Sequence, residues 1–130
     1  MTFTNSLLEN SHLNDEYCNM ILEAMDNGFG NSIITASSLL DEYLQKKHPN
    51  LGLISSITKG NDFDTFKKAY ESDMYKMVVI YPKRKILDYL KVNTSLCERE
   101  KKIEVLIASG CGHCPITTIH YEVESFNNLH

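Results

Sequence analysis

The sequence lacks any long apolar run. None of its hydrophobic stretches approaches the roughly 20 residues that a helix needs to cross a bilayer. The first ten residues have neither the positively charged start nor the apolar middle of a signal peptide. We therefore expect a cytoplasmic protein that does not associate with membranes.

The sequence also lacks a strong excess of charge of either sign. Thirteen basic and seventeen acidic residues give a formal net charge of -4. The densest basic stretches, at 83–85 and 99–102, are short, and acidic residues flank the second. Since domains that bind nucleic acid usually look basic as a whole, we expect no nucleic-acid partner.

Cysteines are too few for the disulfide framework of a small secreted domain. There are 4 in 130 residues, and in a reducing compartment such cysteines bind metal, carry out redox chemistry or simply pack. The chain is 42% hydrophobic and 23% charged, which is typical of a globular protein. Its length suits one core, so we expect a single domain over 1–130.

Strand-like and helix-like patterns alternate along the chain. Short β-rich runs recur at 2–5, 32–35, 52–57, 77–81 and 103–107. The runs near 77–80 and 105–107 are continuously apolar, which is typical of a parallel sheet covered by helices. The alternation predicts an α/β protein of about five strand-helix units joined by right-handed crossovers.

Helical patterns fill the gaps between these strands. We expect helices after Asn14 as an N-cap, from Ser37 or Ser38 to about His48, from Asn61 or Asp62, around 84–90, and from Pro115. In the second helix, Asp41 is placed to help cap the first turn. Tyr17 in the first helix, and Val123 and Phe126 in the last, are expected to face the core.

Two architectures fit five such units. One is a partial TIM-barrel-like sheet and the other is a flavodoxin-like doubly wound sheet. The length favours the doubly wound sheet, because a barrel of eight units needs about 250 residues. The first strand follows Met1 directly, which would suit a barrel fragment whose upstream units are missing. We expect the partial barrel, with the doubly wound sheet as the alternative.

In either architecture ligands bind at the carboxyl ends of the parallel strands. The candidate substrate-binding residues there are Asn5, Ser55, Ser56 and Thr58. Lys59 is the candidate catalytic residue, because a lysine can steer an anionic substrate or, if desolvated, act as a base or an amine nucleophile. The alternative is a surface lysine in a turn closed by Gly60, with serines that only satisfy that turn.

The strongest local signal is the segment 110–115, between an expected strand and an expected helix. Cys111 and Cys114 can converge on one metal ion or close a small disulfide ring. As a zinc or iron–sulfur site the pair needs further ligands, for which His113, His120, Cys97 or a partner chain are candidates. A redox thiol pair and a plain tight turn remain alternatives; in either of those cases we expect no cofactor.

Four segments together resemble a known group of proteins. These segments are 4–8, 13–18, 55–59 and 111–115 with His120-Tyr121, and they resemble poorly characterised bacterial barrel proteins distantly similar to collagenase-like peptidases and radical-SAM barrels. The resemblance implies the later portion of a barrel and an iron–sulfur cluster on its cysteines. The sequence lacks the three-cysteine signature of radical-SAM enzymes.

The functional expectation is a barrel-type protein with a metal-binding or substrate-binding site at the carboxyl rim of its sheet. The alternative is a non-catalytic interaction module, or a barrel fragment that a second copy or a partner chain completes. An open sheet leaves unpaired strand edges, and such edges invite pairing with another chain.

Overall fold

A computed structural model describes residues 1–59, 62–93, 102–106, 122–123 and 126–127. Within these ranges five strands form one sheet, and every neighbouring pair of strands is parallel. The strands are β1 (Thr2–Phe3), β2 (Ser32–Thr35), β3 (Gly52–Ser55), β4 (Tyr75–Ile80) and β5 (Lys102–Val105). The expected α/β fold with alternating strands and helices is confirmed.

The order of the strands in the sheet is the order of the chain, from β1 to β5. A doubly wound sheet needs a point at which the strand order reverses, and the described sheet has none, so the flavodoxin-like alternative does not fit it. Consecutive order is what successive strands of an α/β barrel show. In the described residues the sheet is open, with β1 and β5 at its edges.

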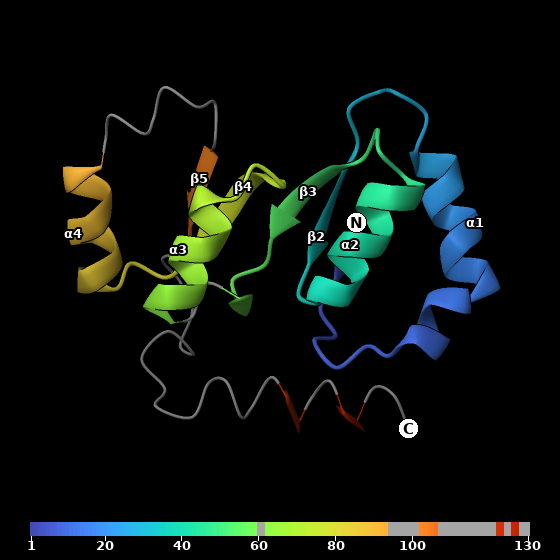
Figure 1. Cartoon of the computed structure of the whole chain (residues 1–130), viewed down its shortest axis with the longest axis horizontal. Coiled ribbons are helices and arrows are strands. Elements are labelled where there is room, and N and C mark those ends of the chain that lie inside the picture. Colours follow the sequence, from blue (N-terminus) through green and yellow to red (C-terminus); the bar gives the residue numbers. More distant parts are fainter. Residues whose placement is uncertain (60–61, 94–101, 107–121, 124–125, 128–130) are drawn as a thin grey trace.

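The helices follow the strands in regular alternation. They are the 3₁₀ helix η1 (Asn10–Asn14) and the α-helices α1 (Glu16–Met25), α2 (Ser38–Lys47), α3 (Phe63–Glu71) and α4 (Arg84–Val92). Right-handed crossovers between strands in consecutive order place the connecting helices on one face of the sheet. Figure 1 shows α2 and α3 in front of the strands.

Side-chain caps fix where the helices begin. The Ser37 hydroxyl accepts from the backbone N–H of Leu40, and the Asp62 carboxylate accepts from the first turn of α3, as the sequence predicted. The cap of α1 is Asp15, whose Oδ1 lies 2.7 Å from the nitrogen of Cys18. The prediction of Asn14 for this role is therefore wrong by one position.

The core lies between the sheet and the helices. Its most deeply buried apolar side chains come from β2, β4 and the helices α1 to α4, and include Leu22, Ile33, Leu44, Phe66, Val78, Ile80 and Ile86. Thr35 lies beside Ser55 in the register of β2 and β3, and both are fully buried. The layer between the sheet and the helices is therefore polar at the carboxyl ends of β2 and β3.

Some apolar side chains do not reach this core. Tyr17 is 77% exposed, and of the residues in α1 only Leu22 is buried. Because β1 spans only two residues, the sheet offers α1 little surface to cover. Val123 and Phe126 are 52% and 56% exposed, so they do not face inward as the sequence suggested; the buried cluster is formed without them.

Across the described part of the chain, no helix combines the length and the apolar character that crossing a membrane would require. The longest helices there, α1 and α2, have 10 residues each, about half of what a span needs.

Candidate functional site

Four side chains form a buried polar cluster at the carboxyl end of the core. They are Thr35, Asp41, Lys59 and Tyr75, from β2, α2, the turn after β3, and β4. The carboxylate of Asp41 lies at the centre and is 1% exposed. Its Oδ1 accepts a hydrogen bond from the Thr35 hydroxyl, and its Oδ2 accepts from the Lys59 ammonium and from the Tyr75 hydroxyl.

Lys59 is drawn inward by this carboxylate. Its backbone N–H donates to the carbonyl of Ser56 at 3.0 Å, which closes the turn after β3. Its side chain is 9% exposed and forms an ion pair with Asp41, so it is not the surface lysine of the alternative interpretation. Burial lowers the pKa of Lys59 below its ordinary 10.5, and the hydrogen bond and charge of Asp41 offset part of that shift.

Tyr75 completes the cluster from the first position of β4. Its hydroxyl donates to Asp41 Oδ2 at 2.5 Å and accepts from Lys59 Nζ at 3.2 Å. Burial, the hydrogen bond to Asp41 and the negative charge of Asp41 all raise the pKa of Tyr75. The phenol therefore keeps its proton at neutral pH and links the cation to the anion.

The cluster lies at the wall of a groove between α2 and α3. The groove has a volume of about 300 Å³. Beside Asp41, Lys59 and Tyr75 it is lined by Ala36, Ser38, Glu42, Thr65, Lys68, Ala69, Ser72 and Met74. This is the lower end of the size range of small-molecule sites, and the mixture of apolar walls with a few polar groups is typical of them.

The other predicted rim residues have local roles. Asn5 Oδ1 accepts from the backbone N–H of Leu7 at 2.8 Å. The hydroxyl of Ser56 accepts from the N–H and the hydroxyl of Thr58, at 3.4 and 3.2 Å. Ser55 is fully buried, and its Oγ has no hydrogen-bond partner among the described residues. Of this predicted set, only Lys59 lines the groove.

Sequence reasoning missed the two partners of Lys59. The sequence places Asp41 where it would help to cap α2, but the Ser37 hydroxyl provides the cap and the Asp41 carboxylate is turned into the core. A signal was present, because Asp41 lies three positions before the buried Leu44 and one after the buried Leu40. A carboxylate on the apolar side of a helix needs a buried partner.

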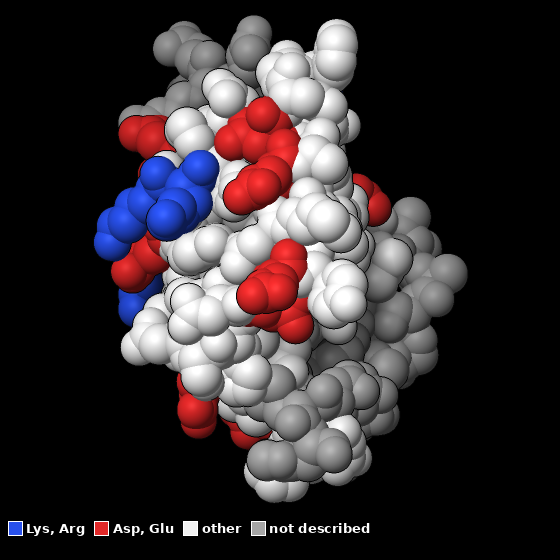
Figure 2. Space-filling model, turned by 90° about the vertical axis from the view of Figure 1, so that its right-hand side faces the viewer, with Lys and Arg blue, Asp and Glu red and all other residues white. Residues whose placement is uncertain are grey.

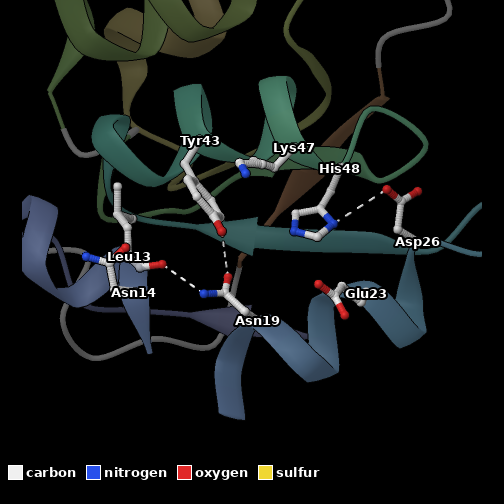
Figure 3. Close-up of a pocket in the computed structure, with 8 residues that line it drawn as sticks. All are labelled: Leu13, Asn14, Asn19, Glu23, Asp26, Tyr43, Lys47 and His48. Atoms are coloured by element: carbon white, nitrogen blue, oxygen red, sulfur yellow. Dashed lines mark hydrogen bonds and ion pairs between the residues drawn. The ribbon is translucent and has the colours of Figure 1, made fainter. Parts of the chain in front are cut away.

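A second, larger groove lies between α1 and α2. Its volume is about 590 Å³, and Figure 3 shows the eight residues that line it: Leu13, Asn14, Asn19, Glu23, Asp26, Tyr43, Lys47 and His48. Tyr43 donates to Asn19 Oδ1 at 2.7 Å, and Asn19 donates to the carbonyl of Leu13 at 2.9 Å. His48 Nδ1 lies 3.5 Å from Asp26 Oδ2. These contacts hold α1 against α2, so we assign them to structure.

The surface over α1 is acidic. Asp15, Glu16 and Glu23 are exposed, and no lysine or arginine occurs from 15 to 26. Figure 2 shows acidic side chains spread over this side of the molecule, with the basic ones at one margin. This side of the described structure therefore does not present the basic surface that nucleic-acid binding requires.

The predicted metal ligands Cys111, His113, Cys114 and His120 lie outside the described residues. So does Cys97. In the part of the chain that is described, no group of three or more His, Cys, Asp or Glu side chains is placed to hold a metal ion. Zinc, an iron–sulfur cluster and a redox thiol pair at Cys111 and Cys114 therefore stay predictions.

Comparison with known proteins adds no identification. The chain matches no protein-family model, and neither a curated protein nor a solved structure matches it. The resemblance to bacterial barrel proteins therefore stays a prediction, and the functional argument depends on the geometry of the polar cluster.

Proposed function

We propose that this protein binds a small, singly charged carboxylate ligand in the groove between α2 and α3, with Lys59 as the group that contacts it. The observation that carries the proposal is a lysine whose side chain is only 9% exposed yet lines a groove of about 300 Å³. A buried cation at the wall of a cavity is an expected site of ligand contact.

The hydrogen-bond inventory leaves Lys59 one donor for a ligand. An ammonium has three N–H groups, and the described neighbours accept two of them, at Asp41 Oδ2 and at the Tyr75 hydroxyl. Because Asp41 already accepts from three side chains, it is the anchor of the cation. The third N–H of Lys59 supports binding of a carboxylate or carbonyl oxygen in the groove.

The charges around the groove favour a singly charged ligand. Lys59 and Lys68 are balanced there by Asp41 and Glu42, so the lining has no net positive charge. A phosphate would carry about two negative charges into this neutral site. A ligand with one carboxylate brings only one negative charge into the groove, and that charge can contact Lys59.

The rest of the lining sets the size and character of the ligand. The hydroxyls of Ser38, Thr65 and Ser72 supply polar contacts, and Ala69 and Met74 supply apolar ones. We therefore propose a short-chain carboxylic acid with a few further oxygen atoms, bound in the cytoplasm. Lys59 contacts its oxygen atoms, and the apolar part of the ligand lies against Met74.

A titration of the full chain with short carboxylic and 2-oxo acids, followed by ligand-observed NMR, tests the proposal. We expect binding that Thr65→Tyr weakens, because a larger side chain at that exposed position of α3 fills the groove. Lys46→Met, at an exposed lysine on α2 away from the groove, should bind as the native chain does. Equal binding by the Thr65 and Lys46 variants, or none by the native chain, would contradict the proposal.

A second candidate function is association through the sheet edges. Within the described residues β1 and β5 are the edge strands of an open parallel sheet, and such edges can pair with a second copy or a partner chain. Sedimentation velocity over a wide concentration range tests this candidate. A monomer at every concentration would argue against self-association through these edges.

A further inference from the structure

We infer that Lys59 is an amine nucleophile that captures the carbonyl carbon of a small aldehyde or 2-oxo acid in the α2–α3 groove as a protonated imine. This inference rests on the proposed function, because it names the reactive class of ligand for the same groove. Its basis is the arrangement of Lys59 between a buried carboxylate, a buried phenol and an opening large enough for a small ligand.

The balance of charge supports capture at this position. The ammonium of Lys59 and the carbonyl compound give the protonated imine and one water molecule, so one positive charge stands on each side of the reaction. The carbon–nitrogen bond forms, the carbon–oxygen double bond breaks, and the water carries away the carbonyl oxygen with two protons from the ammonium. Asp41 therefore keeps a cationic partner, and the buried ion pair survives the reaction.

The cluster also provides a path for the protons. The amine must give up a proton before it attacks, and the departing hydroxyl must receive one before it leaves as water. Asp41 Oδ2 contacts both Lys59 and Tyr75, and the Tyr75 hydroxyl lies 3.2 Å from Lys59 Nζ. Asp41 can accept the first proton, and the Tyr75 hydroxyl can relay it to the departing oxygen.

Burial further favours the nucleophilic form. Because desolvation lowers the pKa of Lys59, the neutral amine is more populated at neutral pH than in a surface lysine. Among the exposed lysines, Lys46 on α2 lies outside the groove and serves as the internal comparison.

Reductive trapping of the full native chain tests this inference. The chain is incubated with glyoxylate or pyruvate and sodium cyanoborohydride, which reduces an imine to a stable secondary amine, and the product is digested and mapped by mass spectrometry. We expect one addition per chain, located at Lys59, with much less at Lys46. The mapping needs no variant, so a folding defect cannot obscure it.

Two further arms separate the possible outcomes. Propionate, which has no ketone or aldehyde carbonyl, should compete for the groove and reduce the labelling of Lys59 without being trapped. Lys59→Met should lose the addition while Lys46→Met retains it. Binding of 2-oxo acids without an addition at Lys59, or equal labelling of Lys46 and Lys59, overturns the inference and leaves the binding site standing. Absence of binding by oxo acids and propionate alike overturns the proposed function itself.

Discussion

The Tyr75 hydroxyl donates a hydrogen bond of 2.5 Å to Asp41 Oδ2, which joins the first residue of β4 to a residue of α2 that lies 34 positions earlier. Lys59 reaches the same oxygen from the turn after β3. One carboxylate therefore fixes the relative positions of β4, α2 and that turn. Its burial makes the cluster costly to disturb, because an unpaired charge inside a protein is strongly unfavourable.

Asp41→Asn should destabilise the fold more than an ordinary surface change. The amide keeps the shape of the carboxylate but leaves the Lys59 ammonium without a counter-charge. Breaking a buried ion pair on one side costs about 3–5 kcal/mol in the free energy of unfolding. Urea unfolding followed by circular dichroism measures the loss.

The matched control for this change is Glu42→Gln, at the next position of the same helix. Glu42 is exposed, and an exposed substitution of this kind usually changes stability by less than about 0.5 kcal/mol. Similar losses for the two variants would show that the contacts of Asp41 do not stabilise the fold in the way that its burial indicates.

Thr35→Val tests the hydrogen bond on the other side of the carboxylate. Valine has nearly the same shape as threonine and suits the middle of a sheet, so the change removes little except the hydroxyl that donates to Asp41 Oδ1. The buried oxygen then lacks its donor, which costs about 1–3 kcal/mol. An unchanged urea midpoint would mean that another group or a water molecule replaces the hydroxyl.

The strands and helices could be predicted from the sequence because the patterns that mark them are local. Apolar runs bounded by turn residues predicted β2 and β3, and Ser37 and Asp62 marked the starts of α2 and α3. The order of the strands in the sheet could not be predicted from local signals, since it depends on how successive strand-helix units pack against one another. Length favours the doubly wound alternative, whereas the sheet follows the order of the chain, as successive strands of the predicted partial barrel would.

Only part of the candidate site could be predicted from the sequence. Lys59 could be nominated, because the loop after a parallel strand is where ligands bind. Its partners come from elements that are distant in the sequence, and no local pattern pairs a lysine with a carboxylate 18 positions away. Tyr75 lies two residues before the predicted start of its strand at Met77. A register shift between Leu53 and Ile54 separates the pairing of Tyr75 from that of Met77.

The predicted metal site at Cys111 and Cys114 has a direct test. If the two thiolates ligate zinc or an iron–sulfur cluster, protein purified without oxygen should contain about one equivalent of zinc or a comparable amount of iron. Changing both cysteines to serine should abolish it, because hydroxyls replace soft thiolates poorly. Elemental analysis measures the content, and Cys18→Ser, at a cysteine on α1, is the matched control.

The same samples distinguish the two alternatives for Cys111 and Cys114, which are a redox thiol pair and a plain tight turn. A redox pair would contain no metal but would cycle between dithiol and disulfide, with one thiol titrating below the ordinary value of about 8.5. Metal that persists in the double serine variant would place the site elsewhere. A sample with neither metal nor a reversible disulfide would leave the tight-turn interpretation.

Lys59 should lose its proton at a lower pH than an ordinary lysine does. Because burial lowers its pKa below 10.5, Lys59 should react with acetic anhydride at a rate that levels off at a lower pH than expected for a lysine with that ordinary pKa. Competitive labelling across a pH series, with peptide mapping, measures this rate. Asp41 raises the pKa of Lys59 by its hydrogen bond and its charge, so Asp41→Asn should move the Lys59 profile to still lower pH.

The same shift has a consequence for stability whose sign can be worked out. As pH rises between the lowered pKa of folded Lys59 and the unfolded value of 10.5, the unfolded chain holds the extra proton, so this group's contribution to the free energy of unfolding increases. Tyr75 acts in the opposite direction above its ordinary pKa of 10.0, since its raised pKa keeps the proton on the folded state. Because the pKa of Tyr89 is also raised, Tyr75→Phe should reduce, but not abolish, the loss of stability expected of the native chain above about pH 10. A labelling profile for Lys59 that levels off only around the ordinary lysine pKa of 10.5 would contradict the desolvation from which its shift arises.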